Sequence, residues 1–279
     1  MTRRLATLAE IAGDFDAIVL DQWGVLHDGT HPYPAAPECL AELSAGGTRL
    51  AVLSNSGKRA APNAARIAGM GFDTGLFEVV MTSGEALWRD IAEGRVVERA
   101  LYAIERAPGD AAAWGDGLDV AITPTLDGAE AVLLMGLPDG AETDTFADAL
   151  AQARTHDLPV FCTNPDRASP RASGQIVISP GALAHAHANA GGQVQFYGKP
   201  HLPVFRALEA ALDAPPERLL MVGDSLEHDI AGGHAAGWST AFVEGGLHAA
   251  VFANGDPKAA LAALLPKGPA PDFTLASLK

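Results

Sequence analysis

The sequence predicts an α/β protein with a parallel sheet and a second, inserted α/β domain. Short apolar stretches alternate with helical segments along the 279 residues, which is typical of chains that build parallel sheets. Several of these stretches end in polar residues and glycine, as strands do where parallel sheets bind ligands. With 48% apolar residues, the chain is long enough for one large or two ordinary domains.

Net charge and cysteine content indicate which partners the protein can bind and in which compartment it is expected. The 19 basic against 34 acidic residues give a net charge of −15, which repels nucleic acid and anionic membranes. Cys39 and Cys162 lie far apart without metal-ligand spacing, so we expect buried free thiols in a reducing compartment. No apolar run approaches the ~18–20 residues of a membrane span, and Glu10 and Asp14 lie where a signal peptide would be apolar. We therefore expect a cytoplasmic protein.

The first expected strand, Ala17–Leu20, is apolar throughout, as in a strand buried on both faces. Asp21 follows it directly. At the carboxyl edge of a parallel sheet, this carboxylate is a candidate nucleophile or metal ligand. An aspartate that only starts the turn before Gly24 would give the same local pattern.

A helix over Ala35–Ser44 and a second strand over Arg49–Leu53 complete one βαβ unit. Its right-handed crossover makes the two strands parallel, so Asp21 and Ser54 are expected at the same edge. Ser54 could instead cap the helix that contains Arg59–Ala68.

The middle of the chain, from about Gly84 to Gly181, predicts the inserted α/β domain, which is within the usual size range. A strand at Phe77–Met81 precedes it, and Ser83 is expected to cap its first helix. Further strands are expected at Arg99–Ile104, Leu118–Ile122, Ala131–Met135 and Pro159–Cys162, with a helix over Glu142–Thr155.

The last third returns to motifs at strand ends. Val194–Phe196 leads into Gly198-Lys199-Pro200, and Lys199 is one of only five lysines, although a solvated loop lysine would look the same. Leu219–Val222 ends in Gly223-Asp224, with Asp229 five residues further. Asp224 and Glu227 could be only a capping box. A last strand is expected at Ser239–Val243.

Together, these strand ends predict a phosphoryl-transfer site. Asp21 and Asp224 supply the hard oxygen ligands that Mg²⁺ prefers, and Asp21 can attack phosphorus with its other oxygen to form an aspartyl-phosphate. Ser54 and the amide of Asn55 can hold phosphoryl oxygens, and Lys199 offsets their charge. Asp229 would orient Lys199 or metal-bound water.

The motifs that carry this chemistry resemble the four motifs of the haloacid dehalogenase superfamily, and the resemblance covers the whole chain. They are Asp21-Gln22-Trp23-Gly24-Val25, Ser54-Asn55, Gly198-Lys199-Pro200 and Gly223-Asp224 with Asp229. The insertion between the second and third motifs resembles the cap of the NagD-like subclass IIA, which includes nucleotide, sugar-phosphate and other small-molecule phosphatases.

The resemblance implies a Mg²⁺-dependent phosphatase of small phosphomonoesters. It implies a Rossmann-like core from residues 1–83 and 182–279, a mobile cap from residues 84–181, and homodimers formed through the cap. It also implies that Trp23 contributes its backbone carbonyl to Mg²⁺.

Trp23 departs from the family pattern. Phosphatases of the superfamily have a second aspartate at this position, as acid for the leaving group and base for water. An indole can do neither, and losing general acid–base catalysis costs about 10²–10⁴-fold. His27, Asp28 and His201 are titratable neighbours in sequence that could substitute, although each could equally be a loop residue without such a role.

Other functions fit the sequence less well or are not distinguished by it. A catalytically impaired relative could bind a phosphometabolite, or hold an aspartyl-phosphate, as a sensor or partner-binding module. Ser225 in Gly-Asp-Ser-Leu matches an esterase block, but the only Asp-x-x-His, Asp28 to His31, precedes it. A zinc site at His27 and His31 would need a helix that Gly29 and Pro32 oppose.

The substrate is not identified by the sequence. In subclass IIA the cap supplies the specificity contacts, and candidates are Asn164, Asp166 and Arg167. A structural turn at Asn164-Pro165-Asp166 explains these residues equally well.

Overall fold

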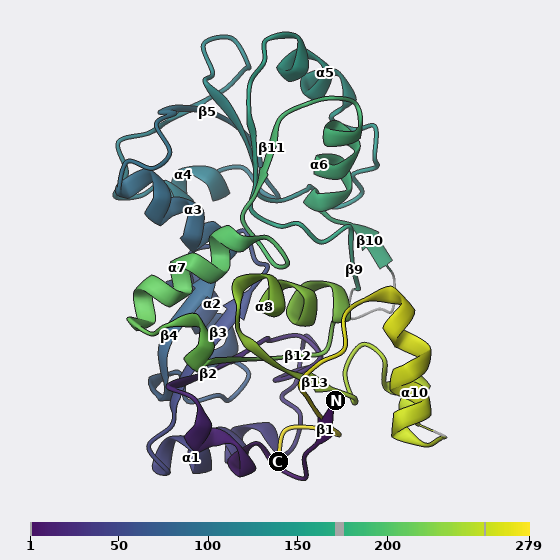
Figure 1. Cartoon of the computed structure of the whole chain (residues 1–279). Coiled ribbons are helices and arrows are strands. Elements are labelled where there is room, and N and C mark those ends of the chain that lie inside the picture. Colours follow the sequence, from purple (N-terminus) through teal and green to yellow (C-terminus); the bar gives the residue numbers. More distant parts are fainter. Residues whose placement is uncertain (1, 171–175, 254) are drawn as a thin grey trace. The chain divides into compact units, whose positions relative to one another are not determined.

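The computed structural model describes residues 2–170, 176–253 and 255–279 (Figure 1). The chain forms two compact units. The first unit comprises Met1–Ser54, Ala61–Met81 and Phe205–Lys279, and the second comprises Asn55–Ala60 and Thr82–Val204.

The first unit contains a seven-stranded sheet in the order β1-β14-β13-β12-β2-β3-β4. Strand β2, Ala17–Leu20, lies between β12 and β3 and pairs in parallel with both. All four residues of β2 are buried, as its continuous apolar run predicts. The other strands are β1 (Arg3–Arg4), β3 (Arg49–Ser54), β4 (Phe77–Thr82), β12 (Leu219–Gly223), β13 (Ser239–Val243) and β14 (Phe273–Leu275).

Apolar side chains of this sheet pack in a core that includes Leu40 and Ile67. Helices accompany the sheet (Figure 1). They are α1 (Ala36–Ala45), α2 (Ala60–Ala68), α7 (Leu202–Leu212), α8 (Ala231–Ala236), α9 (Ala249–Phe252) and α10 (Pro257–Leu264). A short π-helical turn, Leu226–Ile230, precedes α8.

The second unit has its own five-stranded sheet in the order β11-β8-β7-β5-β6, and its neighbouring strands are parallel. The strands are β5 (Ala100–Ile104), β6 (Ala121–Thr123), β7 (Ala131–Leu134), β8 (Val160–Cys162) and β11 (Val194–Phe196). Strands β9 (Ala168–Pro170) and β10 (Ile176–Ile178) form a separate antiparallel pair. The helices are α3 (Ser83–Ala92), α4 (Asp110–Trp114), α5 (Ala147–Thr155) and α6 (Pro180–Asn189).

The predicted fold class is confirmed, because the five-stranded sheet is parallel, β1, β14, β13, β12, β2 and β3 of the other sheet pair in parallel, and the strands alternate with helices along the chain. Cys39 and Cys162 are buried free thiols, and burial raises the pKa of Cys39 to about 11 and that of Cys162 to about 12. Among the described residues, no helix has the length and apolar character that crossing a membrane requires.

The structure corrects the position of one strand. Val194–Phe196 was expected in the core, after a boundary at residue 181, but β11 pairs with β8 in the second sheet. The second unit accordingly extends to Val204. The apolar character of this strand is the same in either sheet, so local sequence could not assign it.

Three local predictions also differ from the structure. The cap of α3 is Thr82 rather than Ser83, since the Thr82 hydroxyl accepts the backbone N–H of Glu85. The helix expected over Glu142–Thr155 begins only at Ala147, and the strand expected at Leu118–Ile122 is β6, Ala121–Thr123.

Candidate active site

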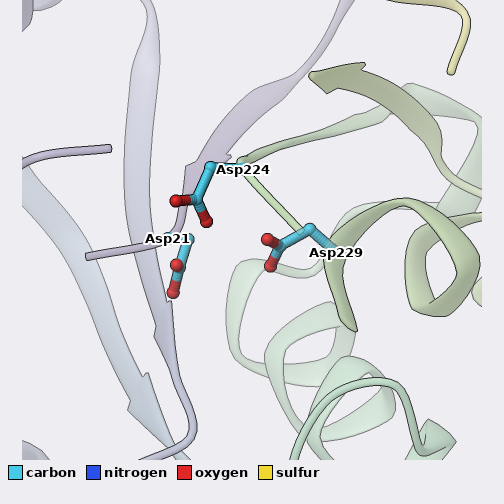
Figure 2. Close-up of side chains that lie close together, drawn as sticks. All are labelled: Asp21, Asp224 and Asp229. Atoms are coloured by element: carbon cyan, nitrogen blue, oxygen red, sulfur yellow. The ribbon is translucent and has the colours of Figure 1, made fainter. Parts of the chain in front are cut away.

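Three carboxylates of the first unit lie together at the carboxyl edge of its sheet. Asp21 follows β2, Asp224 follows the neighbouring β12, and Asp229 lies in the helical turn after β12. The Asp21 N–H donates to the Val222 carbonyl at 2.9 Å, which keeps the two strand ends in register. Each aspartate offers an oxygen within 4.8 Å of the other two (Figure 2).

Glycines make room for these carboxylates. A Cβ at Gly24 would lie 1.7 Å from Asp224 Oδ2, and one at Gly246 would lie 2.2 Å from the same oxygen. A Cβ at Gly223 would lie 2.1 Å from Asp229 Cγ. A side chain at any of these positions would displace the carboxylate, so the cluster depends on the glycines.

Backbone N–H groups hold two of the carboxylates in place. Leu247 donates to Asp224 Oδ2 at 2.6 Å, and Ser225 donates to Asp229 Oδ2 at 3.0 Å. The Ser225 hydroxyl accepts the His228 N–H at 3.1 Å and so caps the helical turn. This contact decides against Asp224 as the helix cap and gives Ser225 a structural role in place of the esterase nucleophile.

The donor set fits a divalent cation. Asp224 and Asp229 are buried and Asp21 is half-buried, so three like charges share a region of low solvent exposure. Such a concentration of carboxylates is costly without a compensating positive charge. Their hard oxygens suit Mg²⁺ or Ca²⁺. In the part of the chain that the structure describes, this is the one group of three or more metal-ligating side chains this close together, so His27 and His31 do not form such a group.

Ser54 lies at the same edge, as predicted. It is the last residue of β3, which pairs with β2 so that Val52 lies opposite Leu20. Helix α2 begins only at Ala60, six residues later, so Ser54 is not its cap.

Asn55 and Lys199 belong to the second unit and contact each other. The Lys199 N–H donates to Asn55 Oδ1 at 2.7 Å, and Asn55 Nδ2 donates to the Lys199 carbonyl at 3.1 Å. Lys199 is 2% exposed. Since β11 lies in the second sheet, Lys199 does not follow a strand of the first sheet, contrary to the sequence prediction.

Comparisons with known proteins identify the family of the chain. A model described as haloacid dehalogenase-like hydrolase matches residues 18–109, and a HAD-hydrolase-like model matches residues 196–278. Chronophin of Rattus norvegicus is 31% identical over 249 residues, which are 85% of this chain and 79% of that protein. The chain belongs to the haloacid dehalogenase-like hydrolases. Glycerol-3-phosphate phosphatase of Gallus gallus is 26% identical over 253 residues, 84% of this chain and 81% of that protein.

Solved structures of this family share the fold. A haloacid dehalogenase-like hydrolase from Brucella suis 1330 has a TM-score of 0.81 and 27% identity, covering 99% of this chain and 100% of that one. NagD from E. coli K-12 has a TM-score of 0.69 and 22% identity, covering 94% and 96%. The likeness to NagD is one of fold, as the predicted resemblance to the NagD-like subclass requires, and the relatives of the chain support phosphatase activity.

Trp23 lies two residues after Asp21 and is 36% exposed. Its indole packs over Gly29, where a Cβ would lie 3.3 Å from Nε1. Backbone hydrogen bonds close the loop below it: Gly24 donates to the His27 carbonyl at 2.9 Å, and Leu26 to the Gln22 carbonyl at 2.8 Å.

The structure argues against two of the three substitutes for an acid at position 23. His27 is 1% exposed, its Nδ1 accepts the Gly29 N–H at 3.0 Å, and burial together with Arg66 lowers its pKa to about 4. Backbone hydrogen bonds from His31 and Thr30 lower the pKa of Asp28, which makes it a poorer proton donor. His201 belongs to the second unit, where its ring stacks on Phe196 at 4.4 Å.

The predicted specificity residues form a turn. The Asp166 N–H donates to Asn164 Oδ1 at 3.2 Å, and the Arg167 carbonyl accepts the Ser179 N–H at 3.0 Å. The Asp166 carboxylate accepts Asn55 Nδ2 at 2.8 Å. Asp166 is thus tied to a residue of the second motif.

Sequence reasoning missed Gly246 and Leu247, which contact Asp224. Gly245-Gly246 reads only as the end of β13, although a glycine pair after a parallel strand is also a signal for close backbone approach. Leu247 carries no signal, because its backbone N–H makes the contact.

Proposed function

We propose that this hydrolase is a Mg²⁺-dependent phosphatase of small phosphometabolites that works through a phosphorylated Asp21. The observation that carries the proposal is the cluster of three carboxylates at the ends of β2 and β12. These carboxylates can bind a metal ion, and the half-buried Asp21 is held at a rigid strand end. Such an arrangement suits nucleophilic attack by Asp21 on a phosphomonoester.

Asp21 has two roles in this proposal. One carboxylate oxygen attacks phosphorus while the ester oxygen leaves with its electron pair, and water then attacks the aspartyl-phosphate to release phosphate. Asp21, Asp224 and the Trp23 backbone carbonyl would hold the Mg²⁺, with Asp229 behind them. When bound, Mg²⁺ supplies positive charge that offsets the charge of the phosphoryl oxygens.

Ser54, Asn55 and Lys199 are assigned to the phosphoryl group. The Ser54 hydroxyl and the backbone N–H of Asn55 would donate to its oxygens, and the Lys199 ammonium would offset their charge in the transition state. The evidence for this assignment is the position of Ser54 next to β2 and the resemblance of the motifs.

The substrate is a small phosphomonoester such as a sugar phosphate or a nucleotide. Relatives named glycerol-3-phosphate phosphatase support this class. A homodimer through the second unit and a cytoplasmic location remain predictions from the sequence, and light scattering on the purified protein would measure the first.

One observation favours a second function. Trp23 is exposed, and its neighbours in sequence, His27 and Asp28, are poor proton donors. With His27 buried and Asp28 held by backbone N–H groups, the loop after Asp21 offers no evident acid. A chain of this kind could hold a phosphometabolite or an aspartyl-phosphate as a sensor rather than turn it over.

Phosphate release separates the two functions. Purified protein is assayed with and without Mg²⁺ on para-nitrophenylphosphate, on an alkyl phosphate and on a panel of phosphometabolites, with Asp21→Asn as the control. The phosphatase proposal predicts Mg²⁺-dependent turnover that the control lacks. Stoichiometric binding of a phosphometabolite without turnover of any ester would support the sensor function and contradict the phosphatase.

A further inference from the structure

We infer that Asp166 is a positioning residue, whose carboxylate fixes the side-chain amide of Asn55 and through it the backbone of Lys199. The inference rests on the proposed function, because it assigns Lys199 to phosphoryl transfer. Asn55, Asp166 and Lys199 all belong to the second unit.

The side-chain amide of Asn55 uses all of its hydrogen-bond donors within the second unit. Its Oδ1 accepts the Lys199 N–H at 2.7 Å, and its Nδ2 donates to the Lys199 carbonyl at 3.1 Å and to Asp166 Oδ1 at 2.8 Å. A primary amide has two N–H donors, and both are used here. The Asn55 side chain therefore has no donor left for a phosphoryl oxygen, and only its backbone N–H can serve that purpose.

Asp166 strengthens the preference of this amide for one of its two orientations. If the amide were flipped, Oδ1 would lie against the Asp166 carboxylate oxygen, and Nδ2 would lie against the Lys199 N–H. The first contact pairs two acceptors and the second pairs two donors. An ionised carboxylate accepts hydrogen bonds only, so Asp166 stabilises the orientation that holds both backbone groups of Lys199.

The turn that carries Asp166 is itself fixed against the Lys199 loop. A Cβ at Gly198 would lie 2.4 Å from Pro165 Cδ and 2.6 Å from Asn55 Oδ1. The Asp166 carbonyl accepts the Gly181 N–H at 3.0 Å, and a Cβ at Gly181 would lie 1.9 Å from the Pro165 carbonyl oxygen. Glycines at both positions allow this close approach, so the Asp166 carboxylate has little freedom to move.

This role differs from the specificity contact that the sequence suggested for Asp166. A residue that binds substrate affects KM first, whereas a residue that holds a catalytic group affects kcat. The two roles therefore predict different kinetics for the same substitution.

The test measures kcat and KM with para-nitrophenylphosphate for wild type, Asp166→Ala and Asp166→Asn. We expect Asp166→Ala to lower kcat by about tenfold with KM changed less than about twofold, because Lys199 loses its fixed position. Asp166→Asn keeps an acceptor oxygen for Asn55 Nδ2, so it should recover most of the lost kcat. Circular dichroism and thermal unfolding check that each variant folds.

A double-mutant cycle tests whether Asp166 acts through Asn55. If it does, the combination of Asn55→Ala with Asp166→Ala should cost no more kcat than Asn55→Ala alone. Asp166→Glu, which displaces the carboxylate by one methylene, serves if the alanine variant does not fold, and should also lose kcat at constant KM. Hydrogen exchange at Gly198 and Lys199 should quicken in the Asp166 variants, a readout that needs no activity.

Two results would overturn the inference while leaving the phosphatase intact. One is a raised KM at unchanged kcat, which would make Asp166 a substrate contact. The other is additive losses in the double variant together with unchanged hydrogen exchange. A wild-type protein that releases no phosphate from any ester contradicts the proposed function instead. In that case, hydrogen exchange at Gly198 and Lys199 alone shows whether Asp166 fixes the Lys199 backbone.

Discussion

The carboxylate cluster of the first unit and the Lys199 cluster of the second unit are built by different means. Asp21 and Asp224 follow adjacent parallel strands, so sheet geometry alone brings them to one edge. Asn55, Lys199 and Asp166 lie on turns, and side-chain to backbone hydrogen bonds bring them together. The first cluster therefore forms where the sheet folds and the glycines leave room for the carboxylates, whereas the second depends on a few specific side-chain contacts.

The largest expected effect comes from the first cluster. Asp21→Asn removes the charged oxygen that attacks phosphorus, so turnover should fall by about 10³-fold or more. The sheet does not need this charge, so circular dichroism and the unfolding temperature should stay close to wild type. Steady-state phosphate release measures the loss. A folded Asp21→Asn protein that keeps more than a few per cent of the wild-type rate would remove Asp21 from its role.

The next prediction separates the two clusters by their response to metal. Asp224→Asn removes a charged ligand, so activity should fall and should partly return at high Mg²⁺. Lys199→Ala removes a cation that acts on the phosphoryl group, so added Mg²⁺ should not restore activity. A Mg²⁺ titration of both variants measures the difference. If added Mg²⁺ restores both variants equally, or restores neither, the assignment of Asp224 to the metal and of Lys199 to the phosphoryl group is wrong.

The sequence predicted the first cluster well for a physical reason. Asp21, Ser54 and Asp224 each follow a continuous apolar strand, and parallel pairing of those strands leaves only one edge for their ends. Asp229 was also predicted, as a residue that acts behind the ligands, and it lies within 4.8 Å of them.

The second cluster was predicted only in part. Local sequence could not assign β11 to the second sheet, because Val194–Phe196 is compatible with either sheet. The contact between Asn55 and Asp166 spans 111 positions and depends on the direction of one amide, for which sequence carries no signal. The same holds for Leu247, which contributes a backbone N–H that any residue other than proline has.

A smaller effect is expected at Trp23, which follows the proposed nucleophile Asp21 by two residues. Trp23→Asp supplies an acid and base that the loop lacks, and general acid–base catalysis is worth about 10²–10⁴-fold. We expect a gain of at least about tenfold on an alkyl phosphate, reduced from the full range by the cavity that the lost indole leaves. On para-nitrophenylphosphate, whose leaving group needs little protonation, the gain should come from faster hydrolysis of the aspartyl-phosphate, the step that limits its turnover. Lower activity on both esters would show that the tryptophan serves substrate packing.

The smallest effect concerns the segment that carries Asn55. Glu85 on α3 pairs with Arg59 at 2.7 Å and with Arg89 at 3.2 Å, and it accepts the Ala60 N–H at 3.1 Å. Burial raises the pKa of Glu85, but these hydrogen bonds outweigh it and hold the pKa below its ordinary value of 4.5. Its stabilising contribution is therefore present above about pH 4.5 and is lost as the pH falls through the lower, folded-state pKa.

Glu85→Gln tests this contribution. We expect a loss of about 1–3 kcal/mol in unfolding free energy at pH 7, since a partly buried charge-assisted pair is broken. The difference from wild type should shrink below about pH 4.5, where Glu85 of the unfolded chain begins to bind a proton, and should vanish below the lower pKa of Glu85 in the folded protein. Denaturant unfolding at several pH values measures the loss in unfolding free energy, and hydrogen exchange over residues 55–60 shows whether the loss arises in this segment. A difference that stays constant with pH would contradict the ion pair as its cause.

Trapping the phosphorylated enzyme tests the central claim most directly. Without an acid or base at position 23, water should attack the aspartyl-phosphate slowly, so dephosphorylation should limit turnover of an activated ester. Rapid acid quench of the protein turning over para-nitrophenylphosphate with Mg²⁺, followed by intact mass and peptide mapping, should show one phosphoryl group on Asp21. Asp21→Asn should show none. A wild-type protein that turns over quickly with no phosphorylated form at any quench time, or one phosphorylated elsewhere, would contradict the account.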